Sequence, residues 1–587
     1  MKNYRFITAY IKKFRLLFWT GIFFLFVTNL LDVAPPLIIM RGIDEITRRA
    51  TAQELLHTAL SFAALTIALA VVRFHWRMQF GKFHQNVSRD LRERIFKKLT
   101  ELGPTFYSRN PIGELMSLMT NDVEAIRMGM GPGLIVLTDA LFYFCTIPPI
   151  MFSLSVPLTV RTLALLPVLP FFISWLGGII HRRYMEVQEN FSELSGITQE
   201  NITGIRIVKS YVQEKNQIIA FNKLSEKWMN SSLKVAWAES FMHPVMEFCV
   251  TIGVVILLFV GAREVVGGAL TIGAFVAFQR YINKMAWPMT AIGWGFSLLS
   301  QARASMDRVE EFLDTPLDVN AVFTEQRPHS TGANSEQETA LNLQGKIEIR
   351  NLNFRYPYSQ KYILNDISLT ISPGDTLGIV GPVGSGKTTL VQLLCHLFEV
   401  ERGKIFVNAI DVRDIPLDVL RKHISLVPQD AFLFSSKISE NMAFGVEMDP
   451  GLEALTRVAQ IAKIDEEIDS LPHKYETYLG ERGVNLSGGQ KQRMTITRAL
   501  LRKSPVIIFD DSLSAIDAHT ESLILRRLNE ETKKHTTIII SHRLSSLSFC
   551  NRIVVLKEGR IEAVGSPQEL RTKSGTYQEL LQLQGYV

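Results

Sequence analysis

A glycine-rich segment near residue 385 has the residue types and spacing that bind phosphate groups. The apolar run 376–380 leads into 381-GPVGSGKT-388 and then into a helix-like stretch at 389–398. Glycines at these positions let backbone N–H groups surround phosphates, while a lysine reaches the outer phosphates and a threonine hydroxyl holds Mg²⁺. We therefore expect a nucleoside triphosphate to bind at Gly381, Pro382, Val383, Gly384, Ser385, Gly386, Lys387, Thr388 and Thr389.

A second short apolar run ends in two carboxylates, in 506-VIIFDD-511. In nucleotide-binding domains such a strand delivers an acid to the metal ion, so Asp510 is expected to hold the Mg²⁺ hydration shell together with Thr388. The alternative reading is a buried strand with a solvated end. The preceding phosphate loop favours the metal role.

The segment 486-LSGGQ-490 lies between these two motifs and precedes a helical pattern. Alone it is compatible with any flexible loop that opens a helix. Following a phosphate loop and preceding the VIIFDD strand, it closely resembles the signature sequence of the ABC transporter ATPase family. The resemblance extends over the whole chain, since TGIRIVKSY and GELMSLMTNDV resemble the coupling helices of ABC exporters, as distinct from importers.

This resemblance assigns roles to further residues. Tyr356 matches the aromatic residue that stacks on adenine, Gln429 the glutamine that senses Mg²⁺ and the γ-phosphate, and His542 the histidine that contacts the γ-phosphate. Segments 480–483 and 512–517 match the stalk-contacting loop and the D-loop. The signature residues that would face a partner's ATP are Ser487, Gly488, Gly489 and Gln490.

One residue departs from the family pattern. The family has a glutamate after the second strand, where it polarises the attacking water, and this chain has Asp511. Aspartate is one methylene shorter, and a displacement of about 1 Å costs up to about 100-fold in rate. The expected result is slow or absent hydrolysis at the chain's own site, with an intact signature completing a partner's site. That asymmetry favours a heterodimer; the alternative is a homodimer in which aspartate suffices.

The chain has two parts of different composition, and these predict the domains that hold the motifs. Residues 344–587 alternate short strands with helices, which indicates an α/β phosphate-loop ATPase domain of the ABC type. Residues 326–343 are polar and aperiodic and read as a linker. Residues 1–325 form an all-helical transmembrane domain of the ABC exporter type, with six apolar stretches long enough to cross a bilayer. These stretches are about 17–40, 57–80, 133–154, 158–181, 242–262 and 270–300.

The polar connections predict the orientation in the membrane. Segments 81–132 and 182–241 are long, helical in pattern and too polar to span, and basic residues gather at the N-terminus and in 81–128. The positive-inside rule then places both termini and both long segments in the cytoplasm. Within those segments, 108–127 and 199–217 read either as solvated hairpins or as docking tips that transmit force. We expect a bacterial inner (cell) membrane.

Polar residues within or near the expected spans are candidates for a substrate site, because ionisable groups in a membrane usually face a cavity or the bundle interior. They are Asn29, Asp32, Asp139, His243 and Glu247. The alternative is that each makes a structural hydrogen bond. Pro35 and Pro36 should interrupt the first span, and Gly273, Gly293 and Gly295 should allow close helix contact in the last.

Together these patterns predict an ATP-driven half-exporter of a hydrophobic or amphipathic molecule. Its cofactors would be ATP and Mg²⁺, and its partners a second half-transporter, the lipid bilayer and a transported small molecule or lipid. The net charge of only +6 gives no indication of nucleic-acid binding. A nucleotide-gated channel or regulator on the same scaffold is the rival reading. A soluble ABC ATPase would require all six spans to be misread.

Overall fold

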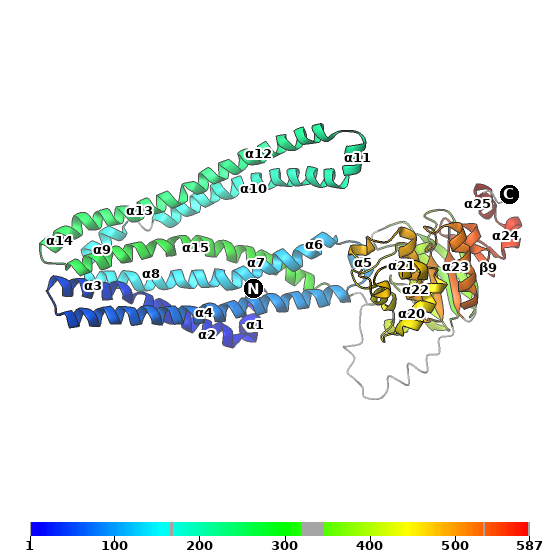
Figure 1. The fold of residues 1–587 in the computed structure, drawn as a ribbon, viewed down its shortest axis with the longest axis horizontal. Coiled ribbons are helices and arrows are strands. Elements are labelled where there is room, and N and C mark those ends of the chain that lie inside the picture. The colour runs from blue at the N-terminus through cyan, green and yellow to red at the C-terminus, as the bar shows by residue number, and fades with distance from the viewer. Residues whose placement is uncertain (1, 165–167, 318–344, 358, 532–534, 585–587) are drawn as a thin grey trace, which may run out of the picture. The chain divides into compact units, whose positions relative to one another are not determined.

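The computed structural model describes residues 2–584 apart from 165–167, 318–344, 358 and 532–534. The described chain forms two compact units, Met1–Lys98 with Gly113–Thr315, and Leu99–Ile112 with Pro316–Val587. Figure 1 shows the first as long helices and the second as an α/β fold. The expected linker 326–343 lies outside the described residues.

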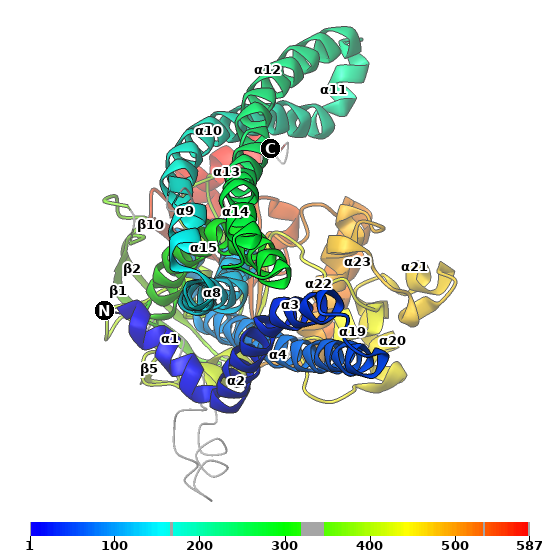
Figure 2. The same cartoon turned by 90° about the vertical axis from the view of Figure 1, so that its left-hand side faces the viewer.

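Helices make up the first unit. They are α1 (Lys2–Lys13), α2 (Arg15–Asp32), α3 (Ala34–Thr47), α4 (Ala52–Glu101), α6 (Ile112–Ser117), α7 (Val123–Met128), α8 (Leu134–Leu154), α9 (Val156–Leu163), α10 (Val168–Thr203), α11 (Ile205–Ser210), α12 (Glu214–Ser240), α13 (Met242–Ile256), α14 (Ala262–Val266) and α15 (Ile272–Leu313). One-turn π-helical segments join α6 to α7, α7 to α8 and α13 to α14. Helices α10 and α12 run side by side, with α11 at their tip (Figures 1 and 2).

Five of the six expected spans, 17–40, 57–80, 133–154, 242–262 and 270–300, lie almost wholly on the described helices of this unit. By length and composition, four helical stretches of the described chain can cross a membrane: Arg15–Thr47, Ala52–Glu101, Ile112–Leu154 and Glu214–Val266. The expected span 158–181 includes residues 165–167, which are outside the described chain. The expected span 270–300 lies in α15 but is not among the four, and it carries Arg280 and Lys284 in its first half.

The first span is interrupted as its prolines predict. Helix α2 ends at Asp32 and α3 begins at Ala34, with proline in the first turn. Pro36 has no N–H to donate to the backbone oxygen of Asp32, four residues earlier. That oxygen instead accepts a hydrogen bond from the Lys284 ammonium group of α15. The Tyr281 hydroxyl of α15 donates to the oxygen of Val33 at 2.8 Å, so α15 caps the interruption twice.

Glycines of α15 allow the close helix contact that the sequence predicts. A Cβ atom at Gly273 would lie 2.1 Å from the backbone oxygen of Met40 in α3. A Cβ atom at Gly295 would lie 2.6 Å from Leu137 in α8. Any side chain at these positions would push α15 away from its neighbours, so both glycines set the spacing of the bundle.

The second unit contains two sheets. The order in the smaller, antiparallel sheet is β2-β1-β4-β5, and in the larger sheet it is β10-β9-β3-β8-β7-β6. The strands are β1 (Ile347–Phe354), β2 (Leu364–Ile371), β3 (Thr376–Val380), β4 (Ile405–Val407), β5 (Ile410–Asp411), β6 (Ile424–Val427), β7 (Val506–Asp510), β8 (Thr536–Ile540), β9 (Arg552–Lys557) and β10 (Arg560–Gly565). Strands β3 and β6 to β9 are parallel, and β10 is antiparallel to β9.

Helices accompany these strands. They are α5 (Pro104–Tyr107), α17 (Lys387–Leu394), α18 (Leu417–His423), α19 (Ile438–Ala443), α20 (Gly451–Ile461), α21 (Asp465–Ser470), α22 (Gly488–Arg502), α23 (Ala518–Glu531), α24 (Pro567–Lys573) and α25 (Gly575–Leu583). The carboxyl ends of β3, β8, β7 and β6 lie along one edge of the larger sheet, which is where ligands bind in open α/β sheets.

The two segments expected to form docking tips fold differently. Segment 199–217 contains the short helix α11 between α10 and α12, as a tip requires. In segment 108–127, by contrast, the GELMSLMTNDV sequence lies in α6 and the π-helical turn after it, on the returning helix. The short helix α5 precedes it, and the stretch Leu99–Ile112 groups with the second unit.

Candidate nucleotide-binding site

The phosphate loop, residues 381–388, connects β3 to α17. Gly384 and Gly386 have positive φ angles of 81° and 96°, which side chains disfavour. A Cβ at Gly381 would lie 2.1 Å from the backbone oxygen of Leu556. Val383 is exposed at the crest of the loop. The three glycines therefore give this turn a shape that other residues would disturb.

Lys387 points back into the loop. Its ammonium group donates to the backbone oxygens of Gly381 and Pro382, both at 2.9 Å. Burial lowers the pKa of Lys387, and the nearby carboxylates of Asp511 and Asp510 oppose this shift. Among the described residues the hydrogen bonds of this buried ammonium group go to neutral carbonyls, so it is well suited to pair with an anion such as a phosphate.

The loop and the second strand meet at Thr388 and Asp510. The Thr388 hydroxyl donates to Oδ1 of Asp510 at 3.1 Å, and Asp510 is buried at the end of β7. Burial raises the pKa of Asp510, while the hydrogen bond from Thr388 lowers it and Asp511 adds to the rise. A cation at this position would stabilise the ionised carboxylate. The structure thus brings together the residues that the sequence paired.

Asp511 follows with a positive φ of 46° and is buried. Its backbone N–H donates to the oxygen of Ile540 in β8 at 2.9 Å, which fixes the main chain. Among the described residues, its buried Oδ1 atom has no hydrogen-bond partner. The same holds for the hydroxyls of Ser385 and Ser512. Buried acceptors normally have partners, so these unsatisfied groups indicate a polar ligand or water here.

Tyr356 lies beside the phosphate loop helix. Its hydroxyl lies 2.9 Å from the hydroxyl of Thr389, and its ring packs edge-on against Phe398 with centroids 5.1 Å apart. The aromatic residue expected near adenine is therefore held by a polar contact to α17 and by an aromatic contact to Phe398, which follows that helix.

Gln429 follows β6 at the same edge and is exposed. Its backbone oxygen accepts from Nε2 of Gln492 at 3.5 Å, and Oε1 of Gln492 accepts from the N–H of Ala515 at 3.1 Å. Gln492 is in α22, directly after the signature. One amide side chain therefore connects the Gln429 loop, the signature helix and the 512–517 loop, and sequence reasoning did not identify it.

His542 follows β8. Burial lowers the pKa of its imidazole, the Lys387 cation lowers it further, and Asp511 opposes the shift. The neutral ring that burial and Lys387 favour can donate or accept one hydrogen bond at a phosphate. The neighbouring Arg543 donates to the backbone oxygens of Ser514 and Ile516, both at 3.0 Å, and so ties this loop to residues 512–517.

The signature forms the start of α22. Ser487 is the N-cap, and it and Gln490 bond reciprocally to each other's backbone N–H groups at 3.3 and 2.9 Å. Ser487 and Gly488 are exposed, and a Cβ at Gly489 would lie 3.0 Å from the oxygen of Ala515. Within the described chain, none of residues 487–490 hydrogen-bonds to the phosphate loop. The helix N-terminus is thus preformed and open to solvent.

The polar residues of the membrane unit converge in part. Asp32 accepts from Arg73 of α4 at 2.7 Å, from Tyr143 of α8 at 2.6 Å and from Lys284 at 2.6 Å. Asn29 and Trp287 lie beside Asp139, and the buried Nδ2 atom of Asn29 has no hydrogen-bond partner among the described residues. Arg73 and Lys284 were not identified from the sequence. Glu247 is exposed on α13 and has no hydrogen bond or ion pair with other described residues, and the side chain of His243 lies outside the described structure.

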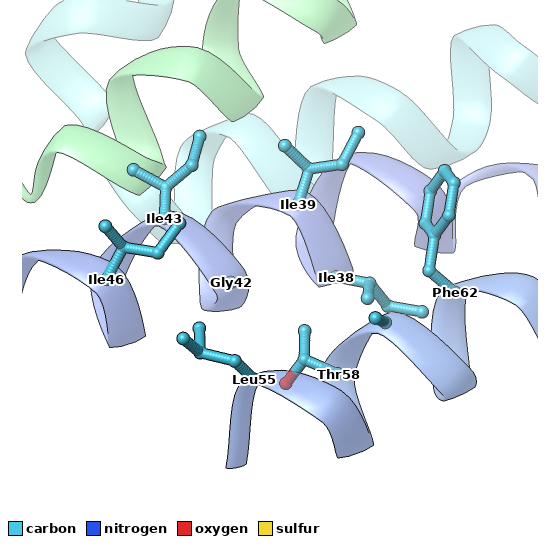
Figure 3. Close-up of a pocket in the computed structure, with 9 residues that line it drawn as sticks. Ile38, Ile39, Gly42, Ile43, Ile46, Leu55, Thr58 and Phe62 are labelled. Atoms are coloured by element: carbon cyan, nitrogen blue, oxygen red, sulfur yellow. The ribbon is translucent and has the colours of Figure 1, made fainter. Parts of the chain in front are cut away.

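A separate groove of about 270 Å³ lies between α3 and α4. Figure 3 shows it lined almost wholly by apolar side chains, including Ile39, Ile43 and Phe62. The hydroxyl of Thr58 in this lining donates to Glu45 at 2.7 Å. The groove contains none of the polar residues named above and has no group suited to catalysis.

Comparisons with known proteins agree with this geometry. The ABC transporter transmembrane region matches residues 18–289, and the ABC transporter family matches residues 364–514. The probable multidrug resistance ABC transporter ATP-binding/permease protein YheI of Bacillus subtilis is 35% identical, over 97% of this chain and 95% of that protein. The multidrug resistance-like ATP-binding protein MdlA of Escherichia coli is 32% identical, over 95% and 93%.

A bacterial Atm1-family ABC exporter with ATP bound has the same fold. It aligns with a TM-score of 0.75 and 23% identity, over 97% of this chain and 98% of that one. The matches cover both units of the chain. The chain therefore belongs to the ABC transporter family as an exporter that joins a transmembrane region to an ATPase domain, and it couples ATP hydrolysis to transport.

Proposed function

We propose that this chain is one half of a heterodimeric exporter of hydrophobic or amphipathic molecules, in which its own ATP site turns over slowly or not at all. Asp511 carries the proposal. Its main chain is fixed by the hydrogen bond to Ile540, so the carboxylate cannot advance to replace the missing methylene. In the proposed cycle this site binds ATP through Lys387 and contributes to closure of the two ATPase domains. The partner's site hydrolyses its ATP.

The exposed signature supports the proposal that this chain pairs with a second subunit. An N-cap with reciprocal side-chain bonds holds the first turn of α22 ready, and the partial positive charge at a helix N-terminus favours a phosphate. Because Ser487 and Gly488 face solvent, the γ-phosphate that they contact would belong to a second subunit. The family's sandwich arrangement, implied by the resemblance, requires this.

The tip formed by α11 gives independent support for the proposal of a second subunit. Ile205, Ile207, Tyr211 and Val212 are all exposed at the tip. Large apolar side chains gathered on an exposed tip indicate a protein contact. In the second unit, Phe432, Phe434 and Phe444 are exposed around Arg498, and the rings of Phe434 and Phe444 stack at 4.5 Å. We propose that the partner's tip docks on this aromatic surface.

Mg²⁺ fits the residues at the carboxyl edge of β7. The hydroxyl of Thr388 and the carboxylate of Asp510 are both oxygen donors, which Mg²⁺ prefers, and Gln429 lies at the same edge. Bound there with ATP, the ion would supply charge neutralisation at the β- and γ-phosphates. The chain's own part is to hold these oxygens, to pair Lys387 with phosphate and to keep His542 at the edge.

The substrate class rests on the membrane unit and on the names of the relatives. YheI and MdlA are both described as multidrug resistance or resistance-like proteins. We propose a small amphipathic molecule or lipid, in a bacterial inner membrane with both termini cytoplasmic. The basic residues of the α1 end, Lys12 and Lys13, and the ion pair from Lys13 to Asp90 suit a cytoplasmic interface.

The test is ATPase activity of the chain purified alone in lipid, with nucleotide binding measured on the same sample. Binding without turnover is the expected result, and adding the native partner should restore turnover. Brisk turnover by the lone chain, abolished by Lys387→Ala, would mean that Asp511 works as the base and that the exporter is a homodimer.

A further inference from the structure

The side chain of Gln584 spans the backbone on both sides of Arg543, next to His542. Its Nε2 group donates to the backbone oxygen of His542 at 2.6 Å, and its Oε1 atom accepts from the N–H of Leu544 at 2.9 Å. One amide thereby fixes two backbone groups of the loop that follows β8. No sequence motif marked this glutamine.

The imidazole of His542 has no such support of its own. Within the described chain its ring makes no hydrogen bond, although it is partly buried beside Lys387 and Asp511. Its position is therefore set by the main chain that carries it. That main chain is held after the histidine by Gln584 and by the Arg543 side chain, which also bonds to Glu521 at 2.8 Å.

Gln584 is itself held firmly. It caps α25, with its N–H donating to Leu580, and α25 buries Tyr577 and Leu581 in the same apolar core as Leu544. Ser574 is the N-cap of this helix, and its hydroxyl donates to Glu562 of β10 at 2.6 Å. Helix α25 is thus anchored at its start, along its buried face and at its end.

We propose that Gln584 is a positioning residue that sets the reach of His542 toward the γ-phosphate of bound ATP. The inference rests on the proposed role of His542. A hydrogen bond contributes about 1 kcal/mol, so losing one that orients His542 should weaken γ-phosphate binding by about fivefold. Binding of a diphosphate, which His542 does not reach, should remain unchanged.

The experiment measures affinity of the full chain in lipid nanodiscs for two probes with Mg²⁺, the non-hydrolysable triphosphate AMP-PNP and ADP. Gln584→Ala should lower the AMP-PNP affinity by about fivefold and leave the ADP affinity within about twofold. Gln584→Glu keeps the acceptor for Leu544 but loses the donor to His542, and it should show the same selectivity. Gln582→Ala is the matched control, since Gln582 is exposed on the same helix.

A double-mutant cycle separates positioning from packing. If Gln584 acts through His542, then Gln584→Ala has no further effect on AMP-PNP affinity in a His542→Ala background. Equal loss of both nucleotides, or full additivity with His542→Ala, would show a purely structural role and overturn the inference.

The cycle also separates the two proposals. If His542→Ala shifts the AMP-PNP to ADP ratio and neither Gln584 variant does, the inference alone is wrong. If His542→Ala leaves the ratio at its wild-type value, the proposed role of His542 fails and the inference fails with it.

Discussion

Lys284 of α15 binds Asp32 twice, through the carboxylate and through the backbone oxygen that Pro36 leaves without a helical donor. The pair closes the gap that two prolines open in the first span. A second cation, Arg73, also pairs with Asp32. The Asp32 side chain is only 11% exposed and accepts hydrogen bonds from both cations. An interrupted helix, normally a weak point, becomes the place where α2, α4, α8 and α15 are joined.

Lys284→Met should therefore destabilise the membrane unit. The substitution keeps most of the side-chain volume but removes donors to a carboxylate and to a freed carbonyl, a loss of about 1–3 kcal/mol. Thermal unfolding in detergent, followed by intrinsic fluorescence, should show a lower midpoint. Lys234→Met is the control, since Lys234 is exposed and its pair with Glu186 is 3.5 Å long. Equal midpoints for Lys284→Met and Lys234→Met would contradict the argument.

Glycine substitutions in two helices should act in opposite directions. Gly273→Ala places a Cβ 2.1 Å from the oxygen of Met40, so α15 must move away from α3, at a cost of about 1–3 kcal/mol. Gly81→Ala meets nothing within 4 Å in α4 and should gain up to about 1 kcal/mol from helix propensity. The same midpoint measurement checks both, and a neutral Gly273→Ala would show that the helices are not held at this spacing.

Asp511→Glu should raise ATP turnover at this chain's own site. Restoring the methylene moves the carboxylate forward by about 1.5 Å, and a shift of this size is worth up to about 100-fold in rate. Steady-state phosphate release by the lone chain in lipid measures it, with Asp511→Glu plus Lys387→Ala as the inactive control. An Asp511→Glu chain that binds ATP yet turns over no faster would show that some other feature limits the site.

Acid should destabilise the ATPase unit through His396. This residue is 3% exposed, and neither ring nitrogen has a partner among the described residues. Burial lowers the pKa of His396 to about 4; Arg421 and Arg413 add to the shift, and Asp411 opposes it. Protons then bind the unfolded chain preferentially between about pH 6.5 and 4, so stability falls as the pH falls through that window.

Between pH 7.5 and 5 this amounts to roughly 2 kcal/mol. His396→Met removes the titrating group, and its unfolding midpoint should fall less than that of the wild type over the same pH change. Differential scanning fluorimetry of the two chains at both pH values makes the comparison. A parallel fall in both would assign the acid sensitivity to other groups.

The ATP site was predictable because its signals are local. The phosphate loop, the VIIFDD strand and the signature each lie within a few residues, and their spacing alone dictates glycine turns, a buried strand and a capped helix. The strands expected at 376–380 and 506–511 are β3 and β7. Strands β2, β4, β5 and β10 were not predicted; β4 and β5 have only two or three residues, too few to show a periodicity.

What escaped prediction depends on pairing between distant segments. Lys284 and Asp32 are 252 residues apart, and a lysine within an apolar helix gives no sign of its partner. Gln584 directly follows α25 and belongs to no motif. The short helix α5 was not predicted because its four residues carry no distinctive pattern, whereas the distinctive GELMSLMTNDV sequence occupies the returning helix.

The grouping of Leu99–Ile112 with the second unit has a consequence for biosynthesis. A ribosome makes this stretch early, and the end of the unit that it joins is about 475 residues further along. At about 5–20 residues per second, the stretch waits roughly 25–95 s for its companion. During translation the stretch Leu99–Ile112 is thus present long before the rest of its unit, which makes it a natural point for chaperone binding or proteolysis before the chain is complete.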